Sequence, residues 1–156
     1  MALTFHVVVN LTHEHQIGPE DVDRLCTHLS ALPVFRTVVL GERGYRGPTL
    51  DLIVESGRAT VFFGDIERGI KLASQDETCT QRGVVSLRND TYPELELDQV
   101  EVRHRELISR ARALCILRHY LTTGEAIDLV RWPPDDWDAW GDPEATPDPP
   151  GEGIPF

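Results

Sequence analysis

Residues 49–65, TLDLIVESGRATVFFGD, hold two apolar runs joined by a short polar turn. Placing residues 56 and 57 in a two-residue turn, a common β-hairpin connection, sets Glu55 opposite Arg58. Because successive side chains of a strand point to opposite faces, one face of this hairpin is wholly apolar and is predicted to be buried. That face carries Leu50, Leu52, Val54, Ala59, Val61 and Phe63.

The opposite face of the hairpin has a mixed character. It carries Asp51, Ile53, Glu55, Arg58, Thr60 and Phe62. Packing of the first face against the core does not explain why this second face carries two large apolar side chains. Apolar patches of this kind mark contact sites. We therefore expect Ile53 and Phe62 to meet a loop, the C-terminal tail or a partner protein.

The segments before the hairpin predict a strand, a helix and a second strand. Alternation over residues 3–9 is typical of a strand, and residues 11–16 are interpreted as its connection to a helix that starts near Pro19 and stops at Pro33. The helix is predicted to bury Val22, Leu25, Cys26 and Leu29. Further strands are expected at 35–40, 70–74, 83–87 and 126–132, and a loop at 41–48.

A long amphipathic helix is predicted over residues 103–122, with Gly124 as its C-terminal cap. Its expected buried stripe is Leu107, Ile108, Ala111, Leu114, Cys115 and Leu121. The elements together predict one α+β domain, residues 1–132, with helices packed on one face of a mainly antiparallel sheet. Residues 133–156 are rich in Pro, Gly and acids, so an irregular acidic C-terminal arm is expected there.

The net charge of −11 is concentrated in this arm. Residues 133–156 carry seven acids and no Lys or Arg, which leaves −4 for the rest of the chain. Such a charge argues against direct nucleic-acid binding and favours a basic protein as partner, although the acids can also serve only to keep an exposed arm solvated. The apolar runs are too short for a membrane helix, residues 1–10 lack the features of a signal peptide, and three cysteines predict a reducing, cytoplasmic location.

Two motifs suggest chemistry. His13, Glu14 and His15 are potential zinc ligands, but no second Cys and His cluster stands at zinc-site spacing, so a His-rich loop is the preferred interpretation. Cys115 and His119 lie four residues apart on the second helix, where Cys115 is predicted to belong to the core. We therefore predict no catalytic residues, no cofactor and no enzymatic activity.

Acids and tryptophans are the candidate partner contacts. Asp65 and Glu67 follow the hairpin, where turn formation is the simpler explanation. The arm places two indoles among acids, and tryptophan contributes disproportionately to interface energy. The arm candidates are Asp135, Asp136, Trp137, Asp138 and Trp140. The two indoles either anchor a basic partner or fold back over Ile53 and Phe62, and both can hold together.

The order of these features resembles the deaminase-immunity family of bacterial polymorphic toxin systems. The resemblance covers about residues 20–132 and rests on a hairpin that ends in aromatic residues and an acid, then a late helix, a glycine and a short segment closing on tryptophan. The matching positions are Leu50, Leu52, Val61, Phe62, Phe63, Asp65, Gly124, Val130 and Trp132. Ile127 stands where family members often carry proline.

The resemblance implies a protein that binds a cognate toxin domain one to one and blocks its substrate cleft. Such a toxin often attacks nucleic acid, as a deaminase does, and is then basic, which agrees with the acidic charge of this chain. Two alternatives stay open: an acidic adaptor or chaperone for a basic protein, and a small metal-binding enzyme that uses His13, Glu14 and His15. We assign Trp132 to the core and not to the contact surface.

Overall fold

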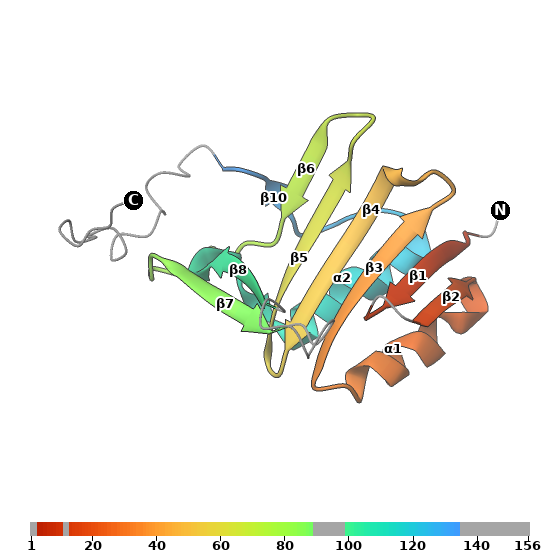
Figure 1. The fold of residues 1–156 in the computed structure, drawn as a ribbon, viewed down its shortest axis with the longest axis horizontal. Coiled ribbons are helices and arrows are strands. Elements are labelled where there is room, and N and C mark those ends of the chain that lie inside the picture. The colour runs from red at the N-terminus through yellow and green to blue at the C-terminus, as the bar shows by residue number, and fades with distance from the viewer. Residues whose placement is uncertain (1–2, 11–12, 89–98, 135–156) are drawn as a thin grey trace.

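The computed structural model describes residues 3–10, 13–88 and 99–134. Its main sheet is antiparallel throughout, with strand order β10-β6-β5-β4-β3-β1-β2, and a short strand β9 pairs with β5 (Figure 1). The strands of this sheet are β1 (Phe5–Val9), β2 (His13–Ile17), β3 (Val34–Gly41), β4 (Gly44–Glu55), β5 (Arg58–Asp65), β6 (Ile70–Ala73), β9 (Ile108–Ser109) and β10 (Val130–Arg131). The predicted α+β class with a mainly antiparallel sheet is confirmed, whereas residues 135–156 of the predicted arm lie outside the described residues.

The hairpin β4–β5 has the predicted register. Glu55 lies opposite Arg58 and Leu50 opposite Phe63, with residues 56 and 57 in the turn. Five of the six side chains predicted to be buried on one face have no exposed surface, and Phe63 is half-buried. The alternation of apolar and polar residues was sufficient to predict this register, because a slip of one residue would turn the apolar set toward water.

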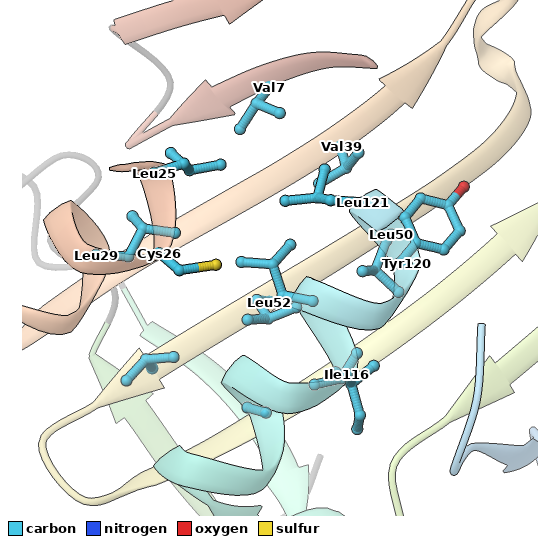
Figure 2. Close-up of a cluster of buried hydrophobic side chains, with 14 of the residues drawn as sticks. Val7, Leu25, Cys26, Leu29, Val39, Leu50, Leu52, Ile116, Tyr120 and Leu121 are labelled. Carbon is cyan, nitrogen blue, oxygen red and sulfur yellow. The ribbon is translucent and has the colours of Figure 1, made fainter. Parts of the chain in front are cut away.

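Both helices pack on that apolar face, as expected. Helix α1 (Val22–Ser30) follows a 3₁₀ turn, Pro19–Asp21, and buries the four predicted side chains, while α2 (Arg110–Thr123) crosses behind β3 and β4 in the view of Figure 1. Figure 2 shows Leu25 and Leu29 of α1 gathered with Leu52 of β4 and Ile116 of α2 in one cluster. Full burial of such side chains stabilises the fold by about 1.5–3 kcal/mol each.

The buried stripe of α2 differs from the prediction. The helix begins at Arg110, because residues 103–109 form the end of a strand, a 3₁₀ turn and β9. The side chains that α2 buries are Ala113, Ile116, Leu117, Tyr120 and Leu121. Residues 114–117 are all apolar, so the sequence allows two different buried stripes. The ring of Tyr120 packs between Phe5 and Phe63, which selects the stripe observed in the structure. Cys115 is exposed, and its assignment to the core was wrong.

A small second sheet covers part of the opposite face. It consists of β7 (Val84–Arg88) and β8 (Gln99–Arg103), and its side chains Leu87 and Val102 form a cluster with Ile53. The pair Glu55 and Arg58 joins the two sheets, because the carboxylate of Glu55 also accepts from the backbone N–H of Arg88 at 3.1 Å. Ile53 was expected to meet a loop, the C-terminal tail or a partner, but it packs on this second sheet instead. Strand β8 was not predicted.

Three other boundaries differ from the predictions. Residues 13–16, interpreted as a connection, belong to the edge strand β2, and the predicted loop at 41–48 belongs to β4 from Gly44 onward. The last strand contains only Val130 and Arg131. Gly124 caps α2 as predicted, with φ of 81° and its N–H bonded to the carbonyl of Tyr120. Among the described helices, none is long and apolar enough to cross a membrane.

Candidate functional site

The turn between β5 and β6 holds the first predicted contact residue, Asp65. Its side chain is only 3 % exposed, on the helix-covered face beyond Phe63. One carboxylate oxygen accepts from the backbone N–H of Arg68 at 3.3 Å, and the other lies 3.7 Å from the Arg68 guanidinium. Asp65 therefore closes the turn on itself, and its buried carboxylate is poorly placed to contact a partner.

The second predicted contact residue of this turn, Glu67, is exposed. Its carboxylate pairs with the guanidinium of Arg43 in the turn between β3 and β4. The two turns are also joined through the backbone, because the N–H of Glu67 donates to the carbonyl of Arg46 at 3.3 Å. This end of the sheet is thus formed by two turns that support each other.

An apolar groove of about 350 Å³ lies beside these turns, on the face of the sheet opposite the helices. Its main lining residues are Tyr45, Phe62, Ile66, Lys71, Leu72 and Trp132. Tyr45 is 58 % exposed and Ile66 is 75 % exposed, the largest exposures among the big apolar side chains of the described chain. Apolar surface gathered in a concave site is characteristic of a binding surface.

Trp132 forms one wall of the groove. Its ring meets Phe62 edge to face with centroids 6.4 Å apart, and the ammonium of Lys71 lies 6.0 Å from the indole centroid. The Nε1–H donates to the carboxylate of Glu106 at 2.6 Å, while the backbone N–H donates to the carbonyl of Lys71. The assignment of Trp132 to the core was therefore wrong: the half-buried indole packs on the face opposite the main core.

Glu106 is the buried residue that orients this wall. It is 7 % exposed at the end of the 3₁₀ turn His104–Glu106, and its other carboxylate oxygen accepts from the backbone N–H of Arg103 at 2.9 Å. Its backbone carbonyl accepts from the hydroxyl of Ser74 at 2.8 Å. A buried carboxylate with several donors is held firmly, so the indole that bonds to it has a defined position.

The charge of the groove is positive. Two charged side chains line it, Asp51 and Lys71. Asp51 is neutralised by a bidentate pair with Arg36, with N–O distances of 2.7 and 3.1 Å. The ammonium of Lys71 is therefore the charge that an occupant of the groove would meet. An acidic protein thus presents a groove with a cation in its wall.

The five arm candidates, Asp135, Asp136, Trp137, Asp138 and Trp140, lie outside the described residues. The described chain ends at Pro134, two residues after the groove wall. Pro134 lines a small cavity together with Ala73 and Glu106. The arm therefore starts from a point next to the groove.

The three potential metal ligands at the N-terminal end are separated by the sheet. His13 and His15 stand opposite Val9 and Val7, which point into the main core, so their side chains lie on the helix side. Glu14 points to the other face, where it lies 3.2 Å from the imidazole of His6. A site that uses all three is excluded by this alternation. Across the described part of the chain, no group of three or more His, Cys, Asp or Glu side chains is placed to hold a metal ion.

A larger depression of about 600 Å³, with a mixed polar and apolar lining, lies between β2 and α1. Its charged residues are already engaged: Arg24 pairs with Asp21 at 2.6 Å, and Asp21 also accepts from the backbone N–H of Gly18. Both bonds lower the pKa of Asp21, and the bond from the backbone of Gly18 has the larger effect. The arrangement is that of a helix start, since acids are favourable there.

The remaining reactive groups are the cysteines. Cys26 is buried in the core, as predicted, and burial raises the pKa of its thiol. Cys115 is exposed on α2, and the imidazole of His119, one turn later, lies 3.8 Å from the carboxylate of Glu125.

Sequence reasoning missed Tyr45, Ile66 and Lys71. Tyr45 was interpreted as part of a glycine-rich loop, although an aromatic residue between strands is a sign that the hairpin extends further. Ile66 and Lys71 follow Gly64 and Asp65 in the sequence, but only the pairing of β6 with β5 and β10 brings them to one groove with Trp132.

The described residues form an α+β fold with an exposed apolar groove at one end of the main sheet. No protein-family model matches the chain, and no curated protein shows significant similarity to it. Membership of the deaminase-immunity family stays a prediction that rests on the resemblance described above.

Proposed function

We propose that this chain neutralises a cognate toxin domain, an enzyme acting on nucleic acid such as a deaminase, by forming a one-to-one complex that blocks the toxin's substrate cleft. The observation that carries the proposal is the exposed apolar groove between Tyr45, Ile66 and Trp132, from whose wall the acidic arm departs. We place this complex in the cytoplasm, with a protein partner and neither nucleic acid nor membrane.

The groove has the composition of a protein-binding surface. Tyrosine and tryptophan are the residue types that contribute most to interface energy when they are buried by a partner. Tyr45 at the start of β4 and Ile66 in the β5–β6 turn lie in segments whose backbones are joined by the bond from the N–H of Glu67 to the carbonyl of Arg46, so the backbone that carries them is in place before a partner arrives. Preorganised contacts of this kind improve affinity, because less conformational entropy is lost on binding.

The charge of the chain supports a basic partner. A toxin that binds nucleic acid presents Lys and Arg along its substrate cleft, and a chain with a net charge of −11 attracts that surface over long range. Electrostatic attraction of this type raises the association rate and is screened by salt. An acidic inhibitor also competes directly with the phosphate groups of the substrate.

The positions that carry the resemblance fall into two groups in the structure. Leu50, Leu52 and Val61 are fully buried in the main core, whereas Phe62 and Trp132 contact each other in the groove. Asp65 closes the turn beside that groove. The feature that resembles the family therefore includes part of the surface that we propose for toxin binding.

The test is a calorimetric titration of the full chain into the basic enzyme domain encoded beside it, at low and at moderate salt. We expect one-to-one binding with nanomolar affinity that weakens with salt, together with loss of the toxin's activity. Ile66→Asp is expected to weaken binding at least about tenfold, because it places a charge on the apolar rim. Ile127→Asp is the matched control, since Ile127 is exposed but does not line the groove.

Three results would contradict the proposal. Absence of binding would remove the functional meaning of the resemblance. Binding that leaves the toxin active would favour the adaptor or chaperone alternative instead. Equal affinities for Ile66→Asp and Ile127→Asp would place the toxin on another surface of this chain.

A further inference from the structure

Among the described residues that line this apolar groove, the one charged side chain without an ion-pair partner is a cation. Tyr45, Phe62 and Trp132 supply its apolar wall, and Lys71 lies over the indole of Trp132. Its second charged lining residue, Asp51, accepts from the Nε and from one terminal nitrogen of the Arg36 guanidinium. The matching occupant is a segment with large apolar side chains flanked by carboxylates.

The same chain contains such a segment close by. Residues 135–140 read DDWDAW and carry two indoles and three acids. They lie outside the described residues, but the described chain ends at Pro134, beside Ala73 of β6. The segment therefore begins at one end of the strand that forms the floor of the groove.

The chain length is sufficient for the segment to reach the whole groove. Strand β6 spans Ile70–Ala73, and four residues of a strand extend over about 10 Å. An extended chain covers up to about 3.3–3.6 Å per residue, so Trp137 can lie up to about 11 Å from Pro134 and Trp140 up to about 21 Å. A short tether of this kind gives an effective concentration in the millimolar range, so weak contacts are enough to populate the docked state.

We propose that residues 135–140 dock in the groove of their own chain, with the indoles of Trp137 and Trp140 against Tyr45, Phe62 and Ile66 and the acids directed toward Lys71. Docking covers the exposed apolar surface of the free protein, so a toxin that binds the groove takes the place of the arm. The docking itself does not depend on the toxin. The exchange of the arm for a toxin rests on the proposed function.

Nuclear magnetic resonance of the full chain tests the docking without any partner. Trp137→Ala combined with Trp140→Ala is expected to shift the methyl signals of Ile66 and the amide signals of Gly64 and Leu72, while the methyl signals of Leu25 and Val39 in the main core stay unchanged. Phe156→Ala, at the far end of the arm, is the matched control and is expected to leave the groove signals in place. Unchanged groove signals in the double variant would overturn the proposal.

Proteolysis of the full chain gives a second readout. Chymotrypsin cleaves after tryptophan, and a docked segment is cut only when it opens, so the cleavage rate reports the open population. We expect cleavage after Trp137 and Trp140 to be about tenfold faster in Ile66→Asp and in Lys71→Glu than in Ile127→Asp. Equal rates in all three variants would contradict docking on this groove.

Three further outcomes separate the possible occupants and the two proposals. Groove signals that change with protein concentration would assign the occupant to the arm of a second copy and overturn docking within one chain. If the groove signals do not respond to the arm substitutions but the chain still inhibits the toxin, the docking alone is refuted. A chain whose arm docks but which binds no toxin would refute the proposed function alone.

Discussion

The indole Nε1 of Trp132 lies 2.6 Å from Oε2 of Glu106, and this bond fixes the wall of the groove. The two residues are 26 positions apart, one just after the last strand and the other in a turn that leads to α2. Glu106 is buried and receives a second hydrogen bond from the backbone N–H of Arg103. The groove is therefore anchored to the interior of the protein and does not depend only on surface contacts.

Trp132→Phe is expected to lower the free energy of unfolding by about 1–3 kcal/mol, because the buried carboxylate of Glu106 loses a donor. Urea unfolding at pH 7 measures the difference. Tyr45→Phe is the control, since it removes a hydroxyl from an exposed ring and is expected to change stability by less than about 0.5 kcal/mol. Equal stabilities of the two variants would mean that the bond contributes nothing to folding.

Arg110→Met is expected to destabilise the protein by about 3 kcal/mol, because the guanidinium joins α1, β3 and the hairpin turn. It donates to the backbone carbonyls of Leu29, Ser30, Leu32, Pro33 and Ser56. It also lies 5.7 Å from the ring centroid of Phe35. Thermal and urea unfolding provide the measurement.

The control for this variant is Arg118→Met, which removes an exposed pair with Asp23 and is expected to cost less than about 1 kcal/mol. Arg110→Lys keeps the charge but not the planar guanidinium. It is therefore expected to recover less than half of the stability that Arg110→Met loses. Full recovery by lysine would show that charge alone is sufficient.

Tyr120→Phe is expected to remove part of the loss of stability at alkaline pH. Burial, followed by the negative charge of Asp65, raises the pKa of Tyr120 to about 12 in the folded protein. This folded-state pKa is above the unfolded value near 10. The contribution of the neutral Tyr120 to the free energy of unfolding is therefore complete below pH 10 and is lost as pH rises from 10 to 12. It amounts to about 2–3 kcal/mol.

Urea unfolding of the wild type and of Tyr120→Phe between pH 8 and pH 12 measures this effect. The phenylalanine ring retains the packing on Phe5 and Phe63, so the two proteins are expected to have similar stability at pH 8. Tyr45→Phe is the control and is expected to keep the wild-type pH dependence, because Tyr45 is exposed. Parallel curves for wild type and Tyr120→Phe would refute the assignment.

Ser56→Gly is expected to stabilise the hairpin by about 0.5–1 kcal/mol. Ser56 has φ of 56°, a left-handed conformation that costs a residue with a Cβ about 1–2 kcal/mol, and the greater entropy of an unfolded glycine offsets part of the gain. The bond from Arg110 to the carbonyl of Ser56 is retained, because it uses the backbone. Ser56→Val is expected to have the opposite effect, and a stabilising valine would contradict the argument. Denaturation midpoints measure both.

Several elements were predictable because their signals are local. The hairpin register follows from alternation on both sides of the turn, and α1 follows from one unambiguous apolar stripe that begins after Pro19. The cap at Gly124 follows from the ability of glycine to adopt positive φ. Each of these depends on residues within about one turn or one strand of each other.

Other elements were not predictable, because more than one local solution was available. Residues 103–109 have the periodicity of a helix, yet Arg103 pairs with β7, Ile108 and Ser109 pair with β5, and a 3₁₀ turn lies between them. The run 114–117 permits two buried stripes, and packing around Tyr120 decides between them. Residues 13–16 have the local composition of a loop, but they pair with the free edge of β1 and form a strand.

The distribution of charge and the apolar face of the central hairpin follow from the order of residues alone, since net charge adds along the chain and side chains alternate in a strand. The groove does not, because its walls come from β4, β5, β6 and the residue after β10, which are brought together by backbone pairing. The same pairing buries Asp65 and leaves Ile66 exposed, although the two are neighbours in sequence. Local composition sets which residues can bury or bind, and the tertiary structure decides which of them reach the surface together.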